Sequence, residues 1–428
     1  GSGKTRTLTQ RVAELVRSGT AQPEQCLTLT FTRRAAEEMR SRLQKLLPEE
    51  CEQIPVCTFH GLAYRILQEN YNAAGLPQGF EVVAEKDADH NGVLDYEELM
   101  RLALSVLEDS PDLCAQYRQR YAWVSIDEYQ DIDESQYRLI RLLAPDKGNV
   151  CVIGDPDQAI YRFRGADVGF FLRFEEDYPG ARKVFLSRNY RSGESIFTAS
   201  RQMMAPGSLL EDRQVQAIIE DTGKVVLHCA KTDKAEAEFV VHRIEQLIGG
   251  TTFFSMDSGR SEGDTEREYS FADFAVLVRA KAQLDCLEEA LERSGIPYQA
   301  PARDPWQDVD EWDPRADRVS LLTLHAAKGL EFPVVFITGC EEGLLPMSWG
   351  GKSSEEELAE ERRLFFVGMT RAEDRLFLCH AKRRLWQGKI RERTISRFLQ
   401  DIEERLLEHS LSAAPKRRSD NSQLNFFD

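Results

Sequence analysis

Short apolar runs alternate with longer amphipathic stretches along the first 190 or so residues of the chain. The runs are rich in β-branched residues, as in 26–31 (CLTLTF), 123–126 (WVSI) and 150–153 (VCVI). Apolar strands that alternate with amphipathic helices are typical of a parallel sheet covered by helices on both faces. This part of the chain is therefore predicted to form an α/β domain.

A second series of such runs predicts a second α/β domain. Its members are 183–186, 225–227, 274–278, 319–323 and 334–337. Two stretches interrupt the rhythm, a small and charged one at 255–268 and a Pro- and Asp-rich one at 301–317, and both are predicted to be surface loops or linkers. We expect a first domain over 1–182, a second over 183–400 and a flexible tail over 401–428.

Composition limits the class of protein. The 428 residues are enough for two or three domains, and 42% hydrophobic with 30% charged residues indicates a folded globular chain. No apolar run approaches the roughly 18 residues of a membrane span, which excludes an integral helical membrane protein. The net charge of −17 argues at first against a nucleic-acid partner. However, residues 361–398 hold eleven Lys or Arg against four Asp or Glu, so basic surface can still be local.

The cysteines and the first residues carry two further expectations. Nine cysteines occur singly, without a CxxC pair, so a zinc knuckle is not predicted and a reducing cytoplasm is expected. The chain opens on Gly1-Ser2-Gly3-Lys4-Thr5 without an initiator Met, and we expect its natural N-terminus to lie upstream.

The opening GSGKT is the second half of a P-loop. In such loops, backbone N–H groups at a helix N-terminus cradle phosphates. Lys4 would reach the β- and γ-phosphates of ATP, and Thr5 would bind Mg²⁺. The alternative for so short a motif is a Gly-rich turn.

Acidic residues follow a predicted strand at 127–131 (DEYQD). Ligands of open α/β folds bind at the carboxyl ends of parallel strands, which is where Asp127 and Glu128 would lie. Asp127 would hold Mg²⁺, and Glu128 would orient and deprotonate an attacking water. An acidic turn is the alternative, but it becomes unlikely beside a P-loop.

Another polar turn follows the apolar run at 150–153. Gln158 could sense a γ-phosphate, while Tyr161, Phe163 and Arg164 offer stacking and phosphate contacts to single-stranded nucleic acid. Taken alone, such aromatic residues are more often part of a core.

Long motifs occur in one order along the chain. They are 30–36 (TFTRRAA), 58–61 (TFHG), 127–131 (DEYQD), 154–166 (GDPDQAIYRFRGA), 186–192 (LSRNYRS), 323–332 (TLHAAKGLEF) and 361–372 (ERRLFFVGMTRA). Together they resemble the motif series of the UvrD/Rep/PcrA helicases of superfamily 1, in a short form cut at the P-loop. The resemblance implies an α/β P-loop NTPase fold of two RecA-like parallel-sheet domains, with ATP between them and single-stranded DNA across both.

The resemblance also assigns residues. Arg191 and Arg371 would be arginine fingers on the γ-phosphate, Tyr190 would stack on adenine, and Glu331 beside Gly329 would contact the sugar region. The DNA path would be lined by residues of three motifs, namely Phe31, Thr58, His60, Tyr161, Phe163 and Arg164. The expected activity is that of a DNA-dependent ATPase, a 3′→5′ single-stranded DNA translocase or helicase in repair, recombination or replication restart.

The chain departs from the family where relatives carry accessory insertions. The insertion of the first domain is short, at about 68–115, and that of the second is reduced to about 300–317. Translocation is therefore a safer expectation than processive unwinding. Two alternatives stay open: the motor portion of a RecB- or AddA-like helicase–nuclease, and an ATP-gated DNA-binding module that does not unwind.

Two short patterns suggest other ligands. Residues 87–98 fit an EF-hand loop, with Ca²⁺ ligands at Asp87, Asp89, Asn91, Asp95 and Glu98. A solvated acidic turn and helix start is the alternative, because no second loop pairs with it. At the other end of the chain, Gln423–Phe427 (QLNFF) resembles peptides that bind the sliding clamp.

Overall fold

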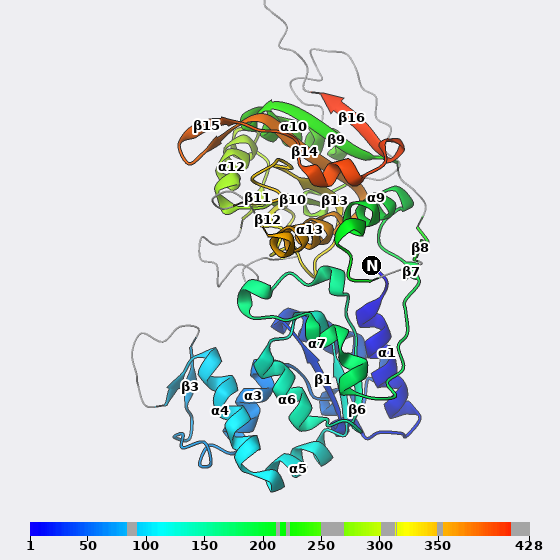
Figure 1. Cartoon of the computed structure of the whole chain (residues 1–428), viewed down its shortest axis with the longest axis vertical. Helices are drawn as coiled ribbons and strands as arrows, with labels where there is room; N and C mark the ends of the chain where they lie inside the picture. Colours follow the sequence, from blue (N-terminus) through cyan, green and yellow to red (C-terminus); the bar gives the residue numbers. More distant parts are fainter. Residues whose placement is uncertain are drawn as a thin grey trace, which may run out of the picture.

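The computed structural model describes residues 1–83, 92–210, 215–219, 223–249, 269–300, 313, 315–348 and 354–411. Two α/β lobes lie one above the other along the long axis, and the N-terminus lies at their junction (Figure 1). Each lobe contains its own parallel sheet. The prediction of two α/β units with parallel sheets is thus confirmed.

The first sheet has four parallel strands in the order β2-β1-β5-β6. Their bounds are β1 Cys26–Thr30, β2 Val56–Thr58, β5 Trp123–Ile126 and β6 Asn149–Val152. The surrounding helices are α1 Lys4–Arg17, α2 Arg33–Leu46, α3 Phe59–Glu69, α4 Tyr96–Asp109, α5 Pro111–Arg120, α6 Glu134–Leu143, α7 Gly169–Leu172 and α8 Phe174–Asp177. A two-stranded ladder, β3 Glu81–Val82 with β4 Val93–Leu94, lies beside α4.

Successive side chains of a strand point to opposite faces, so the first sheet has two apolar layers. On one face Leu27 and Leu29 of β1 pack with residues of α3, α4 and α6. On the other face Cys26 packs with Leu8 of α1 and Met39 of α2. Side-chain caps fix where several of these helices begin: the hydroxyls of Thr32 and Thr58 and the carboxylate of Asp133 each accept a backbone N–H of the first turn.

The second sheet has eight strands, seven of them in the order β11-β12-β10-β13-β14-β9-β16, and β15 pairs antiparallel with β14. The bounds are β9 Val225–Thr232, β10 Phe274–Val278, β11 Tyr298–Gln299, β12 Val319–Thr323, β13 Phe332–Ile337, β14 Ala372–Trp386, β15 Lys389–Glu392 and β16 Leu407–Leu411. Helices α9 Glu194–Met204 and α13 Glu355–Met369 pack on one face, and α10 Asp233–Ile248 and α12 Leu284–Arg293 on the other.

Two predictions about elements are wrong. No strand forms at 183–186, where Val184 and Phe185 are 68% and 61% exposed. The short strand β7 instead spans Arg188–Asn189 and pairs with β8, Gln216–Ala217. The apolar run Val184-Phe185-Leu186 pairs with no strand in the part of the chain that the structure describes.

The expected flexible tail over 401–428 is wrong for its first part. Residues 407–411 form β16, which pairs in parallel with β9 from Leu407 opposite Val225 to Leu411 opposite Cys229. Buried Leu406 and Leu407 hold the strand on the second core. Residues 412–428, the predicted loop at 255–268 and residues 301–312 of the predicted linker at 301–317 lie outside the described residues.

Within the described ranges, no helix has the length and apolar composition needed to cross a membrane.

Candidate functional site

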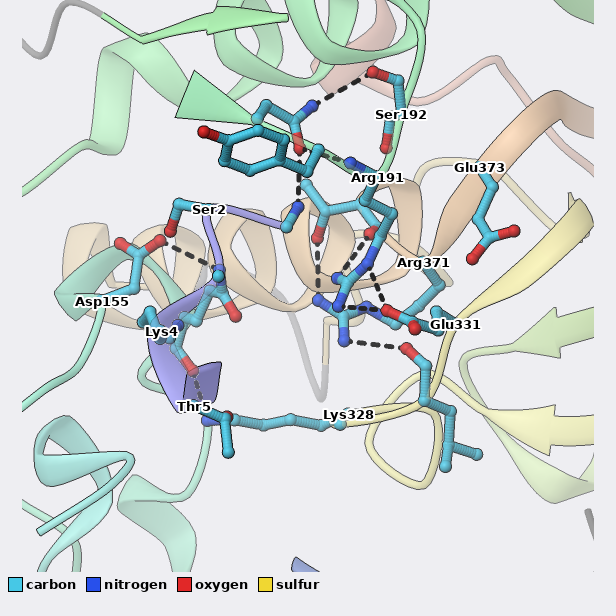
Figure 2. Close-up of a pocket in the computed structure, with 18 of the residues that line it drawn as sticks. Ser2, Lys4, Thr5, Asp155, Arg191, Ser192, Lys328, Glu331, Arg371 and Glu373 are labelled. Carbon is cyan, nitrogen blue, oxygen red and sulfur yellow. Dashed lines mark hydrogen bonds and ion pairs between the residues drawn. The ribbon is translucent and has the colours of Figure 1, made fainter. Parts of the chain in front are cut away.

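A cleft of about 1630 Å³ lies where the two domains meet, and residues of both line it. The first domain contributes Gly1, Ser2, Gly3, Lys4, Thr5, Glu128, Asp155 and Gln158. The second contributes Tyr190, Arg191, Lys328, Gly329, Glu331 and Arg371. In Figure 2, Ser2, Lys4 and Thr5 lie on one side of the pocket, and Arg191, Arg371 and Glu331 lie on the other. The predicted nucleotide residues of the two domains thus share one cavity.

The GSGKT segment forms the start of α1. Gly3 precedes the helix with a φ of 76°, a left-handed conformation that favours glycine. The first N–H groups of α1 have no partner within the helix and, with the helix dipole, favour an anion at this end. Lys4 follows at once, with its Nζ 3.8 Å from Glu128 Oε1. This combination suits a phosphate group.

Thr5 and Asp127 present a pair of hard oxygen atoms. Thr5 Oγ1 donates a hydrogen bond to Asp127 Oδ2 at 3.0 Å, and Asp127 is buried. The described residues hold no cluster of three or more His, Cys, Asp or Glu able to bind a metal. A hydroxyl and one carboxylate nevertheless fit Mg²⁺, which commonly takes its other ligands from phosphates and water.

Glu128 is held in a strained backbone conformation. Its φ of 52° and ψ of 41° are left-handed, which costs a non-glycine residue about 1–3 kcal/mol. Gln130 Nε2 donates to Glu128 Oε2 at 2.5 Å. Burial opposes ionisation, but the charges of Lys4 and Lys328 outweigh it and lower the pKa of Glu128 to about 2. For neighbouring Asp127, burial and the Glu128 charge raise the pKa to about 6.

Two arginines of the second domain reach the same cleft in different ways. Arg371 is buried, and its guanidinium donates to Val367 O, Leu330 O and Thr370 Oγ1 at 2.9, 3.0 and 3.1 Å. Burial, together with the nearby charge of Arg191, lowers the pKa of Arg371 to about 9. An anion that enters the cleft would therefore be attracted by this fixed, desolvated guanidinium group.

Arg191 instead has an acidic partner. Its Nη2 lies 2.7 Å from Glu331 Oε2, and its Nη1 donates to Thr370 O at 3.2 Å. Glu331, predicted to contact the sugar region, is therefore engaged by Arg191 at the rim of the cleft. Tyr190 is 52% exposed beside it, and Gly329 has a φ of 84°.

Three polar residues at the site were not singled out by sequence reasoning. Lys328 Nζ pairs with the buried carboxylate of Asp131 across the domain boundary and donates to Gln158 O at 2.6 Å. Gln130 is fully buried and accepts the N–H of Asp155 at 3.0 Å. All three lie within motifs quoted from the sequence, Lys328 in 323–332 (TLHAAKGLEF) and Gln130 and Asp131 in 127–131 (DEYQD), but none was given a role.

A row of aromatic rings crosses from the first domain to the second. Phe31 and Tyr161 are stacked, with ring centroids 5.2 Å apart and planes at 8°. Phe163 lies 6.1 Å from Tyr161 and meets His325 of the second domain edge-on at 5.2 Å. Arg164 lies over both Tyr161 and Phe163. Phe163 is 64% exposed, which is unusual for a core residue and suits a base platform. His325 was missed, although its motif was recognised.

The other two predicted DNA contacts lie where β2 ends and α3 begins. Thr58 Oγ1 accepts the Gly61 N–H at 3.1 Å and so caps α3. His60 packs on Tyr96 with centroids 5.0 Å apart, and burial lowers its pKa.

The predicted Ca²⁺ and clamp sites fall largely outside the described residues. Asp87, Asp89 and Asn91 are not described, and neither is Gln423–Phe427. Asp95 and Glu98 form a capping box at the start of α4, in which Asp95 Oδ1 accepts the Glu98 N–H at 2.8 Å. Helix capping is the role expected of Asp95 and Glu98 if the segment is an acidic helix start. The Ca²⁺ site and the clamp-binding peptide both stay predictions.

Comparisons with known proteins agree with this arrangement. The family model of the UvrD/REP helicase N-terminal domain matches residues 1–91 and 85–179. The UvrD-like helicase C-terminal domain matches 184–302 and 307–383. The ATP-dependent DNA helicases PcrA of Staphylococcus aureus (strain Mu50 / ATCC 700699) and Staphylococcus epidermidis (strain ATCC 12228 / FDA PCI 1200) are each 26% identical. The alignments cover 96% and 95% of this chain and 84% of each relative.

The first of these alignments extends over 617 positions although this chain has 428 residues, so the relatives carry segments that have no counterpart here. Among solved structures, the C-terminal domain of a possible DNA helicase from Lactobacillus plantarun WCFS1 is 18% identical, over 53% of this chain and 99% of that one. Its TM-score of 0.31 is too low to indicate a common fold. The two family models together span most of the chain, and the chain therefore belongs to the UvrD/REP helicase family of ATP-hydrolysing DNA helicases.

Proposed function

We propose that the protein is an ATP-driven motor that moves 3′→5′ along single-stranded DNA, in repair, recombination or replication restart. The observation that carries the proposal is the position of one loop. Residues 155–164 supply Gln158 to the nucleotide cleft and Tyr161 and Phe163 to the aromatic row. An event at the γ-phosphate and an event at a stacked base would therefore act on the same short segment. The direction and the pathway rest on the family resemblance.

The residues of the cleft divide the chemistry between the domains. Lys4 and the start of α1 would hold the phosphates, and Thr5 and Asp127 would hold Mg²⁺, which neutralises charge on the phosphate oxygens. Ionised Glu128 would orient the attacking water and accept its proton. Arg191 and Arg371 would stabilise the charge that develops on the transferred phosphoryl group, a contribution of about 10³–10⁵ in rate. Because the arginines come from the second domain, hydrolysis would require the cleft to be closed.

A strand-displacement assay with tailed duplexes tests direction and unwinding together. Duplexes with a 3′ tail, a 5′ tail or no tail are compared at equal ATP, with streptavidin displacement from biotinylated single strands as the measure of translocation. Displacement on the 3′-tailed duplex alone supports the proposal. Displacement only from a 5′ tail would contradict the direction. Streptavidin release without duplex opening would favour a translocase, and ATP-dependent binding with neither would favour the ATP-gated binding module.

A further inference from the structure

The loop that contributes residues to both the nucleotide cleft and the aromatic row starts and ends in the first domain but packs on the second. It follows β6 of the first sheet, and the Asp155 N–H is still bonded to Gln130 of the first domain. It is back in the first domain at Ala166, which pairs with Asp133, and Phe170 is buried in the first core. Between these points, residues 156–165 form what we call the strap.

The strap inserts one side chain into the core of the other domain. Ile160 is fully buried in the cluster formed by α9, α13 and the second sheet. Every other buried member of that cluster belongs to residues 196–407. Burial of a whole aliphatic side chain is strongly favourable, so Ile160 anchors the strap to the second domain.

Polar contacts hold the neighbouring strap residues on the same domain. Asp157 Oδ1 accepts the Leu209 N–H, and its Oδ2 accepts the Ser208 hydroxyl, both at 2.7 Å. The carbonyl of Gln158 accepts from Lys328, and the carbonyl of Ala159 accepts from Arg363 Nε at 3.0 Å. Four consecutive residues, 157–160, are therefore bound by the second domain.

Two functional side chains of the strap also contact the first domain, although the Tyr161 ring packs against the second core as well. Gln158 Nε2 donates to Asp155 Oδ2 at 2.9 Å in the cleft, and the Tyr161 ring is stacked on Phe31. Both partners, Asp155 and Phe31, belong to the first domain. A change in the separation of the domains must therefore shift Gln158 relative to the nucleotide and Tyr161 relative to Phe31.

We propose that the strap moves with the second domain and that Ile160 is the positioning residue that transmits domain closure to both the nucleotide cleft and the aromatic row. This inference rests on the proposed function, because it describes how ATP and DNA would be coupled. Ile160 touches neither ligand in this scheme and acts only through Gln158 and Tyr161.

The test uses the whole protein and a matched pair of cavity variants. Ile160→Ala and Ile196→Ala remove the same atoms from the same cluster, but Ile196 lies on α9 and is not part of the strap. Each leaves a cavity of similar size in the second core, so the two variants should lose similar stability. The ratio of ATP turnover with saturating oligo-dT to turnover without it should fall about 3- to 30-fold in Ile160→Ala alone. Ile160→Val, which keeps most of the buried side chain, should restore the ratio to near the wild-type value. An equal fall in Ile160→Ala and Ile196→Ala would overturn the proposal.

Two further measurements keep the proposal testable if Ile160→Ala unfolds or the wild type lacks DNA stimulation. Asp157→Ala removes the hydrogen bonds to Ser208 and Leu209 without leaving a core cavity, and it should also lower the ratio of DNA-stimulated to basal ATP turnover. A wild-type ratio would contradict the proposal.

Hydrogen–deuterium exchange of residues 156–165 needs no DNA. Exchange should accelerate in the strap for Asp157→Ala and not for Ile196→Ala, and unchanged exchange would count against the strap itself. Absent DNA stimulation with this exchange pattern would overturn the proposed function and not the strap.

Discussion

Lys328 of the second domain forms an ion pair with the buried carboxylate of Asp131 in the first domain. The same ammonium group donates to Gln158 O and lies 5.0 Å from the centre of the Tyr161 ring. One cation thus touches the acidic motif, the loop of the nucleotide cleft and the aromatic row. This single lysine therefore links the two domains at the point where the nucleotide cleft and the aromatic row meet.

Lys328→Met should strongly destabilise the fold. The substitution leaves Asp131 buried without its cation, and removing one partner of a buried ion pair typically costs about 3–5 kcal/mol. Chemical denaturation measures the loss. Lys234→Met, in the exposed pair with Glu289, is the control and should cost less than about 1 kcal/mol. The double variant Lys328→Met with Asp131→Asn should recover part of the loss, and a strictly additive double variant would contradict the pairing.

Arg371→Lys should slow ATP hydrolysis by about 10³-fold or more while ATP binding persists. A lysine cannot reproduce the three fixed hydrogen bonds of the guanidinium, so its charge would not be held toward the cleft. Single-turnover hydrolysis and equilibrium binding of a fluorescent ATP analogue separate the two effects. Arg405→Lys on the exposed surface serves as the control. Near wild-type turnover in Arg371→Lys would refute a role at the phosphoryl group.

Tyr161→Ala should weaken binding of single-stranded DNA by about 1–3 kcal/mol, the usual contribution of one base-stacking ring. Fluorescence anisotropy with labelled oligo-dT measures the affinity at fixed salt. Tyr161→Phe keeps the ring that stacks on Phe31 and should bind almost as well as the wild type. If the phenylalanine variant were as weak as the alanine variant, stacking would not be the source of the affinity.

His325 should make stability depend on pH on the acid side. Burial, with the charges of Arg279, Arg164 and Lys328, lowers its pKa to about 3. An unfolded chain binds this proton near pH 6.5, so the unfolded state holds more protons between about pH 6.5 and 3. The stability contributed by neutral His325 is complete above that window and is lost as the pH falls through it.

His325→Phe should therefore show a shallower loss of unfolding free energy between pH 6 and 4, by up to about 1.4 kcal/mol per pH unit. Urea titrations at several pH values give the difference between variant and wild type. His242→Gln at an exposed position is the control and should follow the wild type. Parallel curves for His325→Phe and the wild type would show that His325 is not held neutral.

The parts of the site that were predictable from sequence are those fixed by local rules. A P-loop must precede a helix, and Asp127 and Glu128 follow a strand whose carboxyl end faces the ligand edge of a parallel sheet. Tyr161 and Phe163 were predicted to be base-stacking residues from their type and spacing, and they lie in the aromatic row. The motif series added Arg191 and Arg371, which lie in the same cleft as the P-loop.

The parts that were not predictable depend on how distant segments meet. The partner of Lys328 lies almost two hundred residues away, and no local pattern indicates which carboxylate it reaches. The burial of Ile160 in the second domain is likewise decided by domain packing, whereas an apolar residue after a polar turn gives no sign of it. Strand β16 was missed because LEHSL is short and mostly polar, and its pairing depends on the free edge of β9.

The rate of ATP hydrolysis as a function of single-stranded DNA concentration, in the wild type and in Glu128→Gln, tests the central claim most directly. Turnover by the wild type should rise with DNA to a plateau. Glu128→Gln should bind ATP but hydrolyse it about 10²–10⁴-fold more slowly, with or without DNA, because it lacks the proton acceptor. A wild-type rate that does not respond to DNA would contradict the coupling of the nucleotide cleft to the DNA path. Wild-type turnover in Glu128→Gln would contradict the role of Glu128 in that cleft.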